Sequence, residues 1–238
     1  MLQIQIVSTM RNEAKNLPLF VQMIDDLRLS LKIDLKAVIV NNGSTDKTDV
    51  MINGEFSKVK YIKFLNNPIG SSYADGIELA IKNCETSYAL LVPTDLQFSK
   101  TSVKHVLSLF LTSPALNDSK SLAIFTRRTF RRDGLFNVIR GKIWRTLSTL
   151  ILRVDRKLDP ASQLRIIPIK PYGPIESRNF IWDIELMCLV LNNVTEYQIA
   201  DVEFLPRKFG ESSVGQNLLK SSVEALSGIV SVRKRLSH

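Results

Sequence analysis

Histidine and cysteine are scarce in this chain, which has two of each among its 238 residues. His105 falls inside a helical pattern and His238 is the last residue, so little is available for Ser-His-Asp catalysis, Cys-His catalysis or histidine-bound metal. Cys84 and Cys188 lie in apolar or helix-like surroundings and form no CxxC motif. This usage indicates neither a disulfide framework nor a zinc site, and it fits a reduced, cytoplasmic protein.

Long apolar runs and glycine-rich nucleotide motifs are absent as well. No stretch approaches the roughly 18 consecutive apolar residues that a membrane span needs, and the opening MLQIQIVST has neither a basic leader nor a cleavage site. Neither GxGxxG nor a P-loop motif occurs, which argues against a classical dinucleotide fold and a P-loop NTPase. We therefore expect a protein that does not cross a membrane and is not exported by a signal peptide.

Positive charge is concentrated in one segment. The formal net charge is +9, and between Arg127 and Lys157 ten Lys or Arg residues face only Asp133 and Asp155. Three more cations lie at 233–235, which leaves the remainder of the chain slightly acidic. A negatively charged partner is expected to meet the protein at the basic segment. No RNA- or DNA-binding motif occurs, so nucleic acid is not the expected partner.

Strand and helix patterns alternate through the first 110 residues. Apolar strand patterns lie at 2–9, 36–42, 59–65 and 87–93, and helical patterns at 16–31, 45–52, 70–83 and 100–111. The second half predicts a basic helical stretch, the segment 158–168, a helix over 181–191, a strand over 196–206 and the loop 207–214. This order predicts an α/β fold in one domain, with a central, mostly parallel sheet flanked by helices. Ligands are expected at the carboxyl ends of the strands, in the loops 9–13, 41–46, 66–72 and 93–99.

Six motifs carry a resemblance to a known family. In chain order they are STMRNEAKNLP, VIVNNGSTDKT, NNPIGSSYADGIELA, YALLVPTDLQFS, LDPASQLRI and PRKFGESSV. Together they resemble the family 2 glycosyltransferases of the GT-A fold, most of all the branch of dolichol-phosphate mannose synthase and the polyprenyl-phosphate sugar transferases. The resemblance implies one GT-A domain over 1–214, followed at 215–238 by an amphipathic basic helix packed on the domain or at a membrane or subunit interface. It also implies a hexosyltransferase that inverts the anomeric carbon.

The resemblance places the sugar donor, a nucleotide-diphosphate sugar, in the first two loops. The family pattern P-x-Y/F-N-E keeps Asn12 and Glu13, and the usual D-D-G-S appears with Asn41 and Asn42 in place of both acids. Amides still donate and accept hydrogen bonds to a base but bring no charge. The donor-binding residues implied by the resemblance are Thr9, Asn12, Glu13, Asn41, Asn42, Ser44, Gly70, Asp95, Asp159, Ser162, Arg165, Arg207, Lys208 and Ser212.

The family's D-x-D-L-Q motif appears as the run from Pro93 to Gln97, with one carboxylate missing. The resemblance implies that Asp95 and Gln97 position Mg²⁺ or Mn²⁺ against the donor diphosphate, since such ions bind oxygen ligands and substrate phosphates. Alternatively, arginine and lysine neutralise the diphosphate and the metal is dispensable. The implied catalytic residues are Asp95, Asp183 and Glu185, of which the last two are candidate bases for a hydroxyl acceptor.

The basic segment predicts the acceptor side. Apolar residues recur every three or four positions there, a pattern suited to a membrane interface and equally to an ordinary core-facing helix. The residues of this stripe are Phe136, Ile139, Ile143, Leu147, Leu150 and Val154. In the polyprenyl-phosphate branch this region meets the lipid phosphate, which implies acceptor binding by Arg127, Arg128, Arg131, Arg140 and Trp144.

Three functions remain open from the sequence. The first is transfer to a polyprenyl phosphate or other membrane-associated acceptor by a cytoplasmic protein lying on the inner face of the membrane. The second is transfer to a soluble saccharide, with the basic segment a solvated face. The third is a non-catalytic descendant that binds a nucleotide or partner, because acids are missing at positions 41, 42 and 93. The asparagine turn and the Pro-Thr-Asp run are also ordinary turn and helix-cap sequences.

Overall fold

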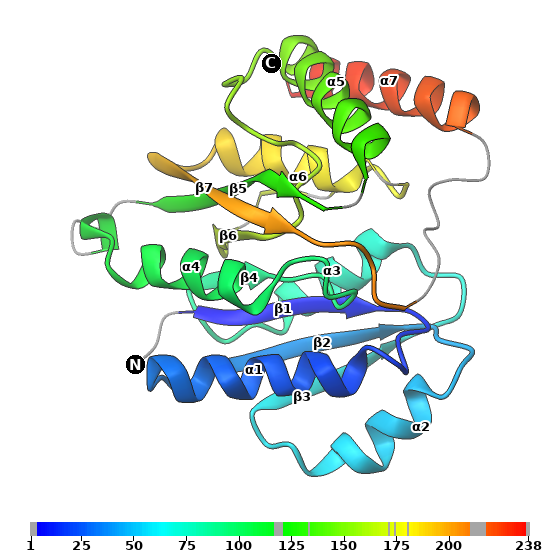
Figure 1. Cartoon of the computed structure of the whole chain (residues 1–238), viewed down its shortest axis with the longest axis vertical. Coiled ribbons are helices and arrows are strands. Elements are labelled where there is room, and N and C mark those ends of the chain that lie inside the picture. Colours follow the sequence, from blue (N-terminus) through cyan, green and yellow to red (C-terminus); the bar gives the residue numbers. More distant parts are fainter. Residues whose placement is uncertain are drawn as a thin grey trace.

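A seven-stranded sheet forms the centre of the protein, with helices on both faces (Figure 1). The computed structural model describes residues 4–116, 121–132, 134–170, 172–173, 175–179, 181–209 and 218–236. The strands are β1 (Ile4–Met10), β2 (Lys36–Asn42), β3 (Ile62–Asn67), β4 (Tyr88–Leu91), β5 (Leu122–Arg131), β6 (Arg165–Pro168) and β7 (Glu196–Phe204). Their order across the sheet is β3-β2-β1-β4-β6-β5-β7.

Strand direction determines where the loops of the site gather. β1 pairs in parallel with β2 and β4, β2 with β3, and β5 with β7, while β6 is antiparallel to both of its neighbours, β4 and β5. Because β6 alone is reversed, the carboxyl ends of β1, β2, β3, β4, β5 and β7 lie at one edge. This edge is where ligands bind in open α/β sheets.

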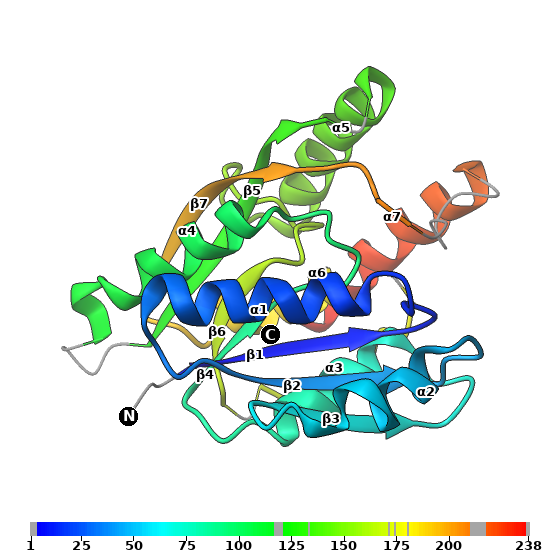
Figure 2. The same ribbon diagram turned by 60° about the horizontal axis from the view of Figure 1, so that its bottom comes forward.

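Different helices cover the two faces of the sheet. They are α1 (Leu17–Leu31), α2 (Thr48–Asn53), α3 (Tyr73–Lys82), α4 (Lys100–Leu111), α5 (Leu135–Leu152), α6 (Trp182–Leu191) and α7 (Leu218–Arg235), with short 3₁₀ turns η1 (Glu55–Lys58) and η2 (Pro114–Leu116). Helices α1 and α4 contribute to one buried cluster, and α3, α6 and α7 to the other. Figure 2 shows α1 crossing in front of the sheet, on the side opposite to α3.

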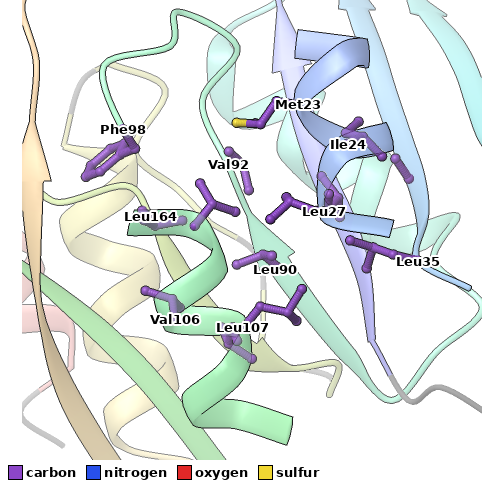
Figure 3. Close-up of a cluster of buried hydrophobic side chains, with 14 of the residues drawn as sticks. Met23, Ile24, Leu27, Leu35, Leu90, Val92, Phe98, Val106, Leu107 and Leu164 are labelled. Carbon is purple, nitrogen blue, oxygen red and sulfur yellow. The ribbon is translucent and has the colours of Figure 1, made fainter. Parts of the chain in front are cut away.

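The first buried cluster fixes α1 and α4 against the middle of the sheet (Figure 3). Leu27 of α1 and Leu107 of α4 are fully buried and lie near Leu90 of β4, and Ile24 of α1 is fully buried in the same cluster. Removal of this apolar surface from water is the main favourable contribution to folding. The loops at the carboxyl edge therefore rise from a closely packed base.

The C-terminal helix α7 packs against α5 and α6. Ala225, Ile229 and Val232 are buried in the second cluster, and the Arg233 Nη1 atom donates to the Leu152 carbonyl oxygen at 3.2 Å. In Figure 1, α5 and α7 lie side by side at the top of the molecule. Among the helices of the described ranges, none is long and apolar enough to cross a membrane.

The predicted fold class is confirmed, but the second half contains two strands that the sequence patterns did not identify. The stretch predicted as basic and helical begins inside β5, whose first half, LAIFT, is fully buried. Strand β6 occupies part of the segment 158–168, where Arg165 interrupts the apolar pattern. Charged residues within a buried strand hid both elements, because strand patterns are recognised by their apolar residues.

Candidate active site

The loops after β1 and β2 are joined by hydrogen bonds. Asn12, whose φ of +57° is left-handed, donates its backbone N–H to Ser44 Oγ at 2.9 Å. Its Oδ1 atom accepts the Thr45 N–H at 2.7 Å, and the Glu13 N–H donates to Thr48 Oγ1 at 3.0 Å. Asparagine tolerates this backbone conformation better than most residues. The two loops predicted to hold the nucleotide therefore form one unit.

The asparagines at the end of β2 are internal. Asn42 is 2% exposed, and its Nδ2 atom donates to the carbonyl oxygens of Ser71 and Ser72 at 3.2 and 2.7 Å. Its Oδ1 atom accepts from Asn67 Nδ2 at 3.0 Å. This position requires a group that both donates and accepts, which an ionised aspartate cannot do. The amide at position 42 thus connects β2 to β3 and to the start of α3.

Two other predicted donor residues also lie beneath the loops. The Asn41 side chain accepts the Ser44 N–H and donates to Asp49 Oδ1, both at 3.3 Å. Thr9 is 1% exposed, and its hydroxyl donates to the Val40 carbonyl oxygen at 3.3 Å. These side chains hold the loops in place from below, and direct contact with a nucleotide stays a prediction for them. Gly70 lies at the surface with a φ of +93°, and a Cβ added there would meet no other atom within 4 Å.

A compact polar group follows β4. The Asp95 Oδ1 atom accepts the Gln97 N–H at 3.2 Å, and its Oδ2 atom pairs with Arg207 Nη2 at 3.1 Å. Arg207 Nε donates to Gln97 Oε1 at 3.2 Å, while Gln97 Nε2 donates to the Leu205 carbonyl oxygen at 3.3 Å. The guanidinium of Arg207 therefore bridges both candidate metal ligands, across loops more than a hundred residues apart in sequence.

Electrostatics couple this group to the first loop. Burial raises the pKa of Asp95, while Arg207 and the Gln97 N–H act against that shift. Burial also raises the pKa of Glu13; the hydrogen bond from Asn16 opposes this rise, and the charge of Asp95 adds to it. The two carboxyl groups thus repel each other within a site that solvates them poorly. A cation placed between them would be favoured.

The donor atoms fit a divalent cation that is shared with a diphosphate. Asp95 Oδ2 and Gln97 Oε1 both face the position of Arg207. Mg²⁺ is commonly held by one or two carboxylates together with substrate phosphates and water. In the described part of the chain, no three His, Cys, Asp or Glu side chains come together as a metal site. The protein atoms alone therefore supply part of a coordination sphere, and the diphosphate would supply more.

An aromatic pair that sequence reasoning missed lies beside these carboxylates. The rings of Tyr73 and Trp182 are 5.0 Å apart. The pKa of the Tyr73 hydroxyl is raised by burial and then by the charges of Asp95, Asp183 and Glu13. Tyr73 therefore lies where the loops after β1 and β4 approach α6. The available signal was one aromatic residue within the third motif, NNPIGSSYADGIELA, and another at the start of the helix predicted over 181–191.

Asp183 is enclosed with a cation. Its Oδ1 atom pairs with Arg165 Nη2 at 2.8 Å, and the two side chains are 4% and 1% exposed. Arg165 also donates to the carbonyl oxygens of Ser162 and Asp183, at 2.5 and 3.1 Å. Burial raises the pKa of Asp183 to about 6, against the opposing effect of Arg165. The structure thus places Arg165 and Asp183 inside the fold, where they join β6 to α6.

Glu185 is also engaged internally. Its carboxylate accepts the backbone N–H groups of Glu176 and Ser177 at 3.3 and 2.7 Å and pairs with Arg235 Nη2 at 2.7 Å. Burial opposes ionisation of this group, but these hydrogen bonds hold its pKa below the usual value. Glu185 thus fastens the C-terminal end of α7 to α6.

Most of the remaining predicted residues lie on β5, which ends at Arg131, on α5, or in the segment before β6. Arg127 binds Asp201, and Arg128 binds Asp159, each through two nitrogens at 2.6 to 2.9 Å. The Ser162 hydroxyl meets Thr126 Oγ1 at 2.6 Å. Arg140 and Lys208 are exposed, Trp144 packs partly buried against the second cluster, and Ser212 lies outside the described residues.

Sequence comparison identifies the family. The model of glycosyl transferase family 2 matches residues 5–160. The chain belongs to this family. It is therefore a glycosyltransferase, as the motifs predicted, while its branch within family 2 stays a prediction. No curated protein matches the family 2 chain in a sequence search.

Solved structures show the same fold. Glucosyl-3-phosphoglycerate synthase from Mycobacterium tuberculosis, bound to Mn²⁺ and UDP-glucose, superposes with a TM-score of 0.70 at 14% identity, covering 98% of this chain and 79% of that one. Its complex with Mn²⁺, UDP and phosphoglyceric acid gives 0.69 at 14% identity, with 97% and 78% covered. Its complex with Mg²⁺ and UDP gives 0.68 at 13% identity, with 98% and 79% covered. The likeness confirms the GT-A fold for this family 2 enzyme.

Proposed function

We propose that this enzyme transfers a sugar from a nucleotide-diphosphate sugar to a polyprenyl phosphate or another membrane-associated acceptor, while lying on the cytoplasmic face of a membrane. The observation that carries the proposal is the outward apolar stripe of α5. Five large apolar side chains on this helix are 41 to 77% exposed: Leu135, Ile139, Ile143, Leu147 and Leu150.

The orientation of the stripe favours a membrane surface over a core-facing helix. The face of α5 that packs inward carries Ser148, Thr149 and Leu152, which are buried. Exposed apolar side chains that follow one helix face mark an interaction surface. Two exposed cations on the same helix, Arg140 and Lys142, would each contribute about 1 kcal/mol near an anionic lipid surface. An apolar face with basic flanks is the pattern of a helix that lies in the membrane interface.

The donor would occupy the loops after β1, β2 and β4. Arg207 and Lys208 would face the diphosphate, with charges already in place before the sugar leaves. Asp95 and Gln97 would hold Mg²⁺ or Mn²⁺, the ions present with UDP in the solved relatives. When bound, such an ion neutralises charge on the leaving diphosphate as a Lewis acid.

The reaction that fits this site is one in-line displacement with inversion. An acceptor phosphate oxygen forms a bond to the anomeric carbon, the bond from that carbon to the diphosphate breaks, and the electron pair leaves with the nucleoside diphosphate. A phosphate monoester is already anionic near neutral pH, so no side chain has to remove a proton. This agrees with the internal contacts of Asp183 and Glu185.

A soluble acceptor is the second candidate. One solved relative was crystallised with phosphoglyceric acid, a small phosphorylated molecule that is not anchored in a membrane. A hydroxyl acceptor would require a base, and the predicted base Asp183 is enclosed with Arg165, although its pKa is raised to about 6. The two candidates differ in whether the exposed apolar stripe of α5 is needed to reach the acceptor.

Vesicle sedimentation tests the membrane proposal. We expect the wild-type enzyme to sediment with vesicles that contain phosphatidylglycerol at low ionic strength. The double variant Ile139→Asn, Ile143→Asn should stay in the supernatant, because both side chains are more than half exposed and their loss removes apolar area from the stripe. Leu29→Asn is the matched control, since Leu29 is 77% exposed on α1. Wild-type enzyme that remains soluble with these vesicles would contradict the proposal.

A further inference from the structure

Tyr73 begins helix α3 at the carboxyl edge of the sheet, and its hydroxyl group has no hydrogen-bond partner among the residues that the structure describes. The side chain is half-buried, and its ring packs on the buried ring of Trp182. Enclosed tyrosine hydroxyl groups usually find a partner. An unpartnered one at the edge where ligands bind is therefore a candidate for contact with a ligand.

The first turn of α3 is held in place by several contacts. The Ser72 Oγ atom accepts the Asp75 N–H at 3.2 Å, and Asp75 Oδ2 accepts the Ser72 N–H at 2.7 Å. Asn42 Nδ2 donates to the Ser72 carbonyl oxygen at 2.7 Å, which ties the turn to β2. Arg178 pairs with Asp75 at 3.1 Å. A capping box with these additional contacts leaves the backbone of Tyr73 little freedom.

Gly76 lets the same turn approach β1. A Cβ at position 76 would lie 2.2 Å from Thr9 Oγ1 and 2.9 Å from Thr9 Cβ, so the observed approach requires glycine. Residues three apart on a helix are neighbours on its surface, so Tyr73 projects from α3 next to this contact. The close packing thus brings Tyr73 to the carboxyl end of β1.

Trp182 fixes the ring of Tyr73. The two ring centroids are 5.0 Å apart, and the ring planes are tilted by 32°. Trp182 is buried and begins α6, so the pair joins the N-terminal turns of α3 and α6. Aromatic rings at this separation attract each other in addition to burying their surface. The hydroxyl group of Tyr73 is therefore held in one position before any ligand binds.

Charges from several segments act on this hydroxyl group. Burial raises the pKa of Tyr73, and three carboxylates raise it further: those of Asp95, Asp183 and Glu13. Arg207 acts in the opposite direction. The hydroxyl group is consequently protonated at neutral pH and is available as a hydrogen-bond donor. The loops after β1 and β4 and the start of α6 thus all approach this one group.

The carboxylates near Tyr73 are already engaged elsewhere. Arg207 Nη2 pairs with Asp95 Oδ2 at 3.1 Å, and Arg165 Nη2 pairs with Asp183 Oδ1 at 2.8 Å. Neither carboxylate accepts the Tyr73 proton in the described part of the chain. An oxygen atom of a bound ligand would complete the hydrogen bonding of the Tyr73 hydroxyl group.

The position of Tyr73 indicates which part of the donor it meets. The nucleotide is predicted in the loops after β1 and β2, and the diphosphate beside Asp95, Gln97 and Arg207. The transferred sugar follows the diphosphate and must extend from there toward the acceptor. Through its contact with Trp182, Tyr73 lies on the side of the diphosphate contacts that faces α6. The sugar is therefore the nearest part of the donor.

We infer that the Tyr73 hydroxyl group donates a hydrogen bond to a hydroxyl oxygen of the transferred sugar and thereby orients the anomeric carbon. The inference rests on the proposed function for the donor, a nucleotide-diphosphate sugar, and is independent of the acceptor. A site that hydrogen-bonds a substrate hydroxyl group discriminates strongly against analogues that lack it. Tyr73 would thus contribute to the choice of sugar as well as to its orientation.

Calorimetric titration of the wild-type and Tyr73→Phe proteins tests the contact. Phenylalanine keeps the ring beside Trp182 and removes only the hydroxyl group. The probes are UDP, GDP, CDP and TDP, each compared with its glucose and mannose conjugates in the presence of Mn²⁺. We expect Tyr73→Phe to raise the Kd of the sugar nucleotide that binds about five- to tenfold. The Kd of the corresponding nucleoside diphosphate should not change, because it has no sugar to meet the hydroxyl group.

Each other outcome of the titration has a distinct meaning. An equal rise for the sugar nucleotide and the nucleoside diphosphate would place the hydroxyl group at the diphosphate and overturn the inference. Unchanged affinities for both would also overturn it, while the donor site itself would stand. If the wild-type protein bound none of the probes, the inference would fail together with the proposed donor. The vesicle experiment tests the membrane acceptor separately.

Tyr197→Phe is the matched control. Tyr197 lies at the amino end of β7, away from the carboxyl edge, and its hydroxyl group meets Asp155 Oδ2 at 3.4 Å. Its ring is also paired, 6.0 Å from that of Phe125. This variant should leave every Kd unchanged. The melting temperature of Tyr73→Phe should not fall, because the lost hydroxyl group has no partner in the described structure. A fall together with raised Kd values for both classes of probe would assign Tyr73 a structural role and overturn the inference.

Deoxy analogues of the sugar nucleotide that binds identify the accepting oxygen. The analogue that lacks this hydroxyl group should bind the wild-type protein about as weakly as the parent compound binds Tyr73→Phe. The same analogue should lose no further affinity in the variant, because the hydrogen bond is already absent. If every deoxy analogue lost affinity independently of Tyr73→Phe, the hydroxyl group would not contact the sugar, and the inference would be overturned.

Discussion

Asn42 explains why the end of β2 carries amides where the family pattern has acids. Its amide nitrogen faces two carbonyl oxygens and its oxygen faces the Asn67 amide. A carboxylate at this buried position would point negative charge at both carbonyl groups. The amide at position 42 thus has a structural role in the loop. The missing negative charge does not weaken the fold at this position.

Replacement of Asn42 by Asp should therefore destabilise the protein. We expect the free energy of unfolding to fall by about 2–4 kcal/mol near pH 8, because two hydrogen bonds are lost and two carbonyl groups are left unsatisfied. Near pH 4 the loss should shrink, since a protonated carboxyl group can donate to one of them. Urea denaturation at both pH values measures the difference. Asn66→Asp, at an exposed site on β3, is the control; equal stability of the two variants at pH 8 would contradict the explanation.

At the scale of elements, α7 is held by its last turn. Arg235 pairs with the buried carboxylate of Glu185, which also accepts two backbone N–H groups from the segment before α6. Arg235→Ala should lower the free energy of unfolding by about 1–2 kcal/mol at pH 7, a value reduced because the Arg235 side chain is 31% exposed. Lys234→Ala, at the exposed neighbouring position, should have little effect.

The pH dependence follows from the sign of the shift at Glu185. Its pKa is lowered in the folded protein, so its contribution is present above the pKa of the unfolded chain and is lost as pH falls through the folded value. The stability difference between wild type and Arg235→Ala should therefore disappear in acid. A difference that stays constant from pH 7 down to pH 3 would show that Arg235 acts through packing alone.

The elements also show what could be predicted from sequence. The four strands of the first half were predictable because their apolar runs are bounded by polar turns, and β7 because it alternates. Strands β5 and β6 were not, since Arg127, Arg128 and Arg165 find ion-pair partners only in the folded chain. The loop motifs predicted Asp95, Gln97 and Arg207 as one group. The contact of Tyr73 with Trp182 depends on packing that has no local signature.

At the scale of the whole molecule, ligand binding should be visible as stability. A ligand that binds only the folded state at 100 times its Kd stabilises by about 2.7 kcal/mol. For a chain of this size this corresponds to a rise of about 5–10 °C in melting temperature. We expect such a rise with one of the UDP, GDP, CDP or TDP sugars, larger with Mn²⁺ than without it, since Asp95 and Gln97 present oxygens to a shared cation.

Two variants assign that rise to the carboxyl edge. Asp95→Asn should abolish the additional shift with Mn²⁺, because it removes the one carboxylate of the pair of candidate ligands. Arg207→Ala should weaken binding of the sugar nucleotide without metal but increase the additional shift with Mn²⁺, because Arg207 occupies the oxygens that the ion needs. If Arg207→Ala lost the Mn²⁺ effect as well, the guanidinium and the metal would act together on the diphosphate. In that case the ion pair between Arg207 and Asp95 would form only in the protein without a bound sugar nucleotide.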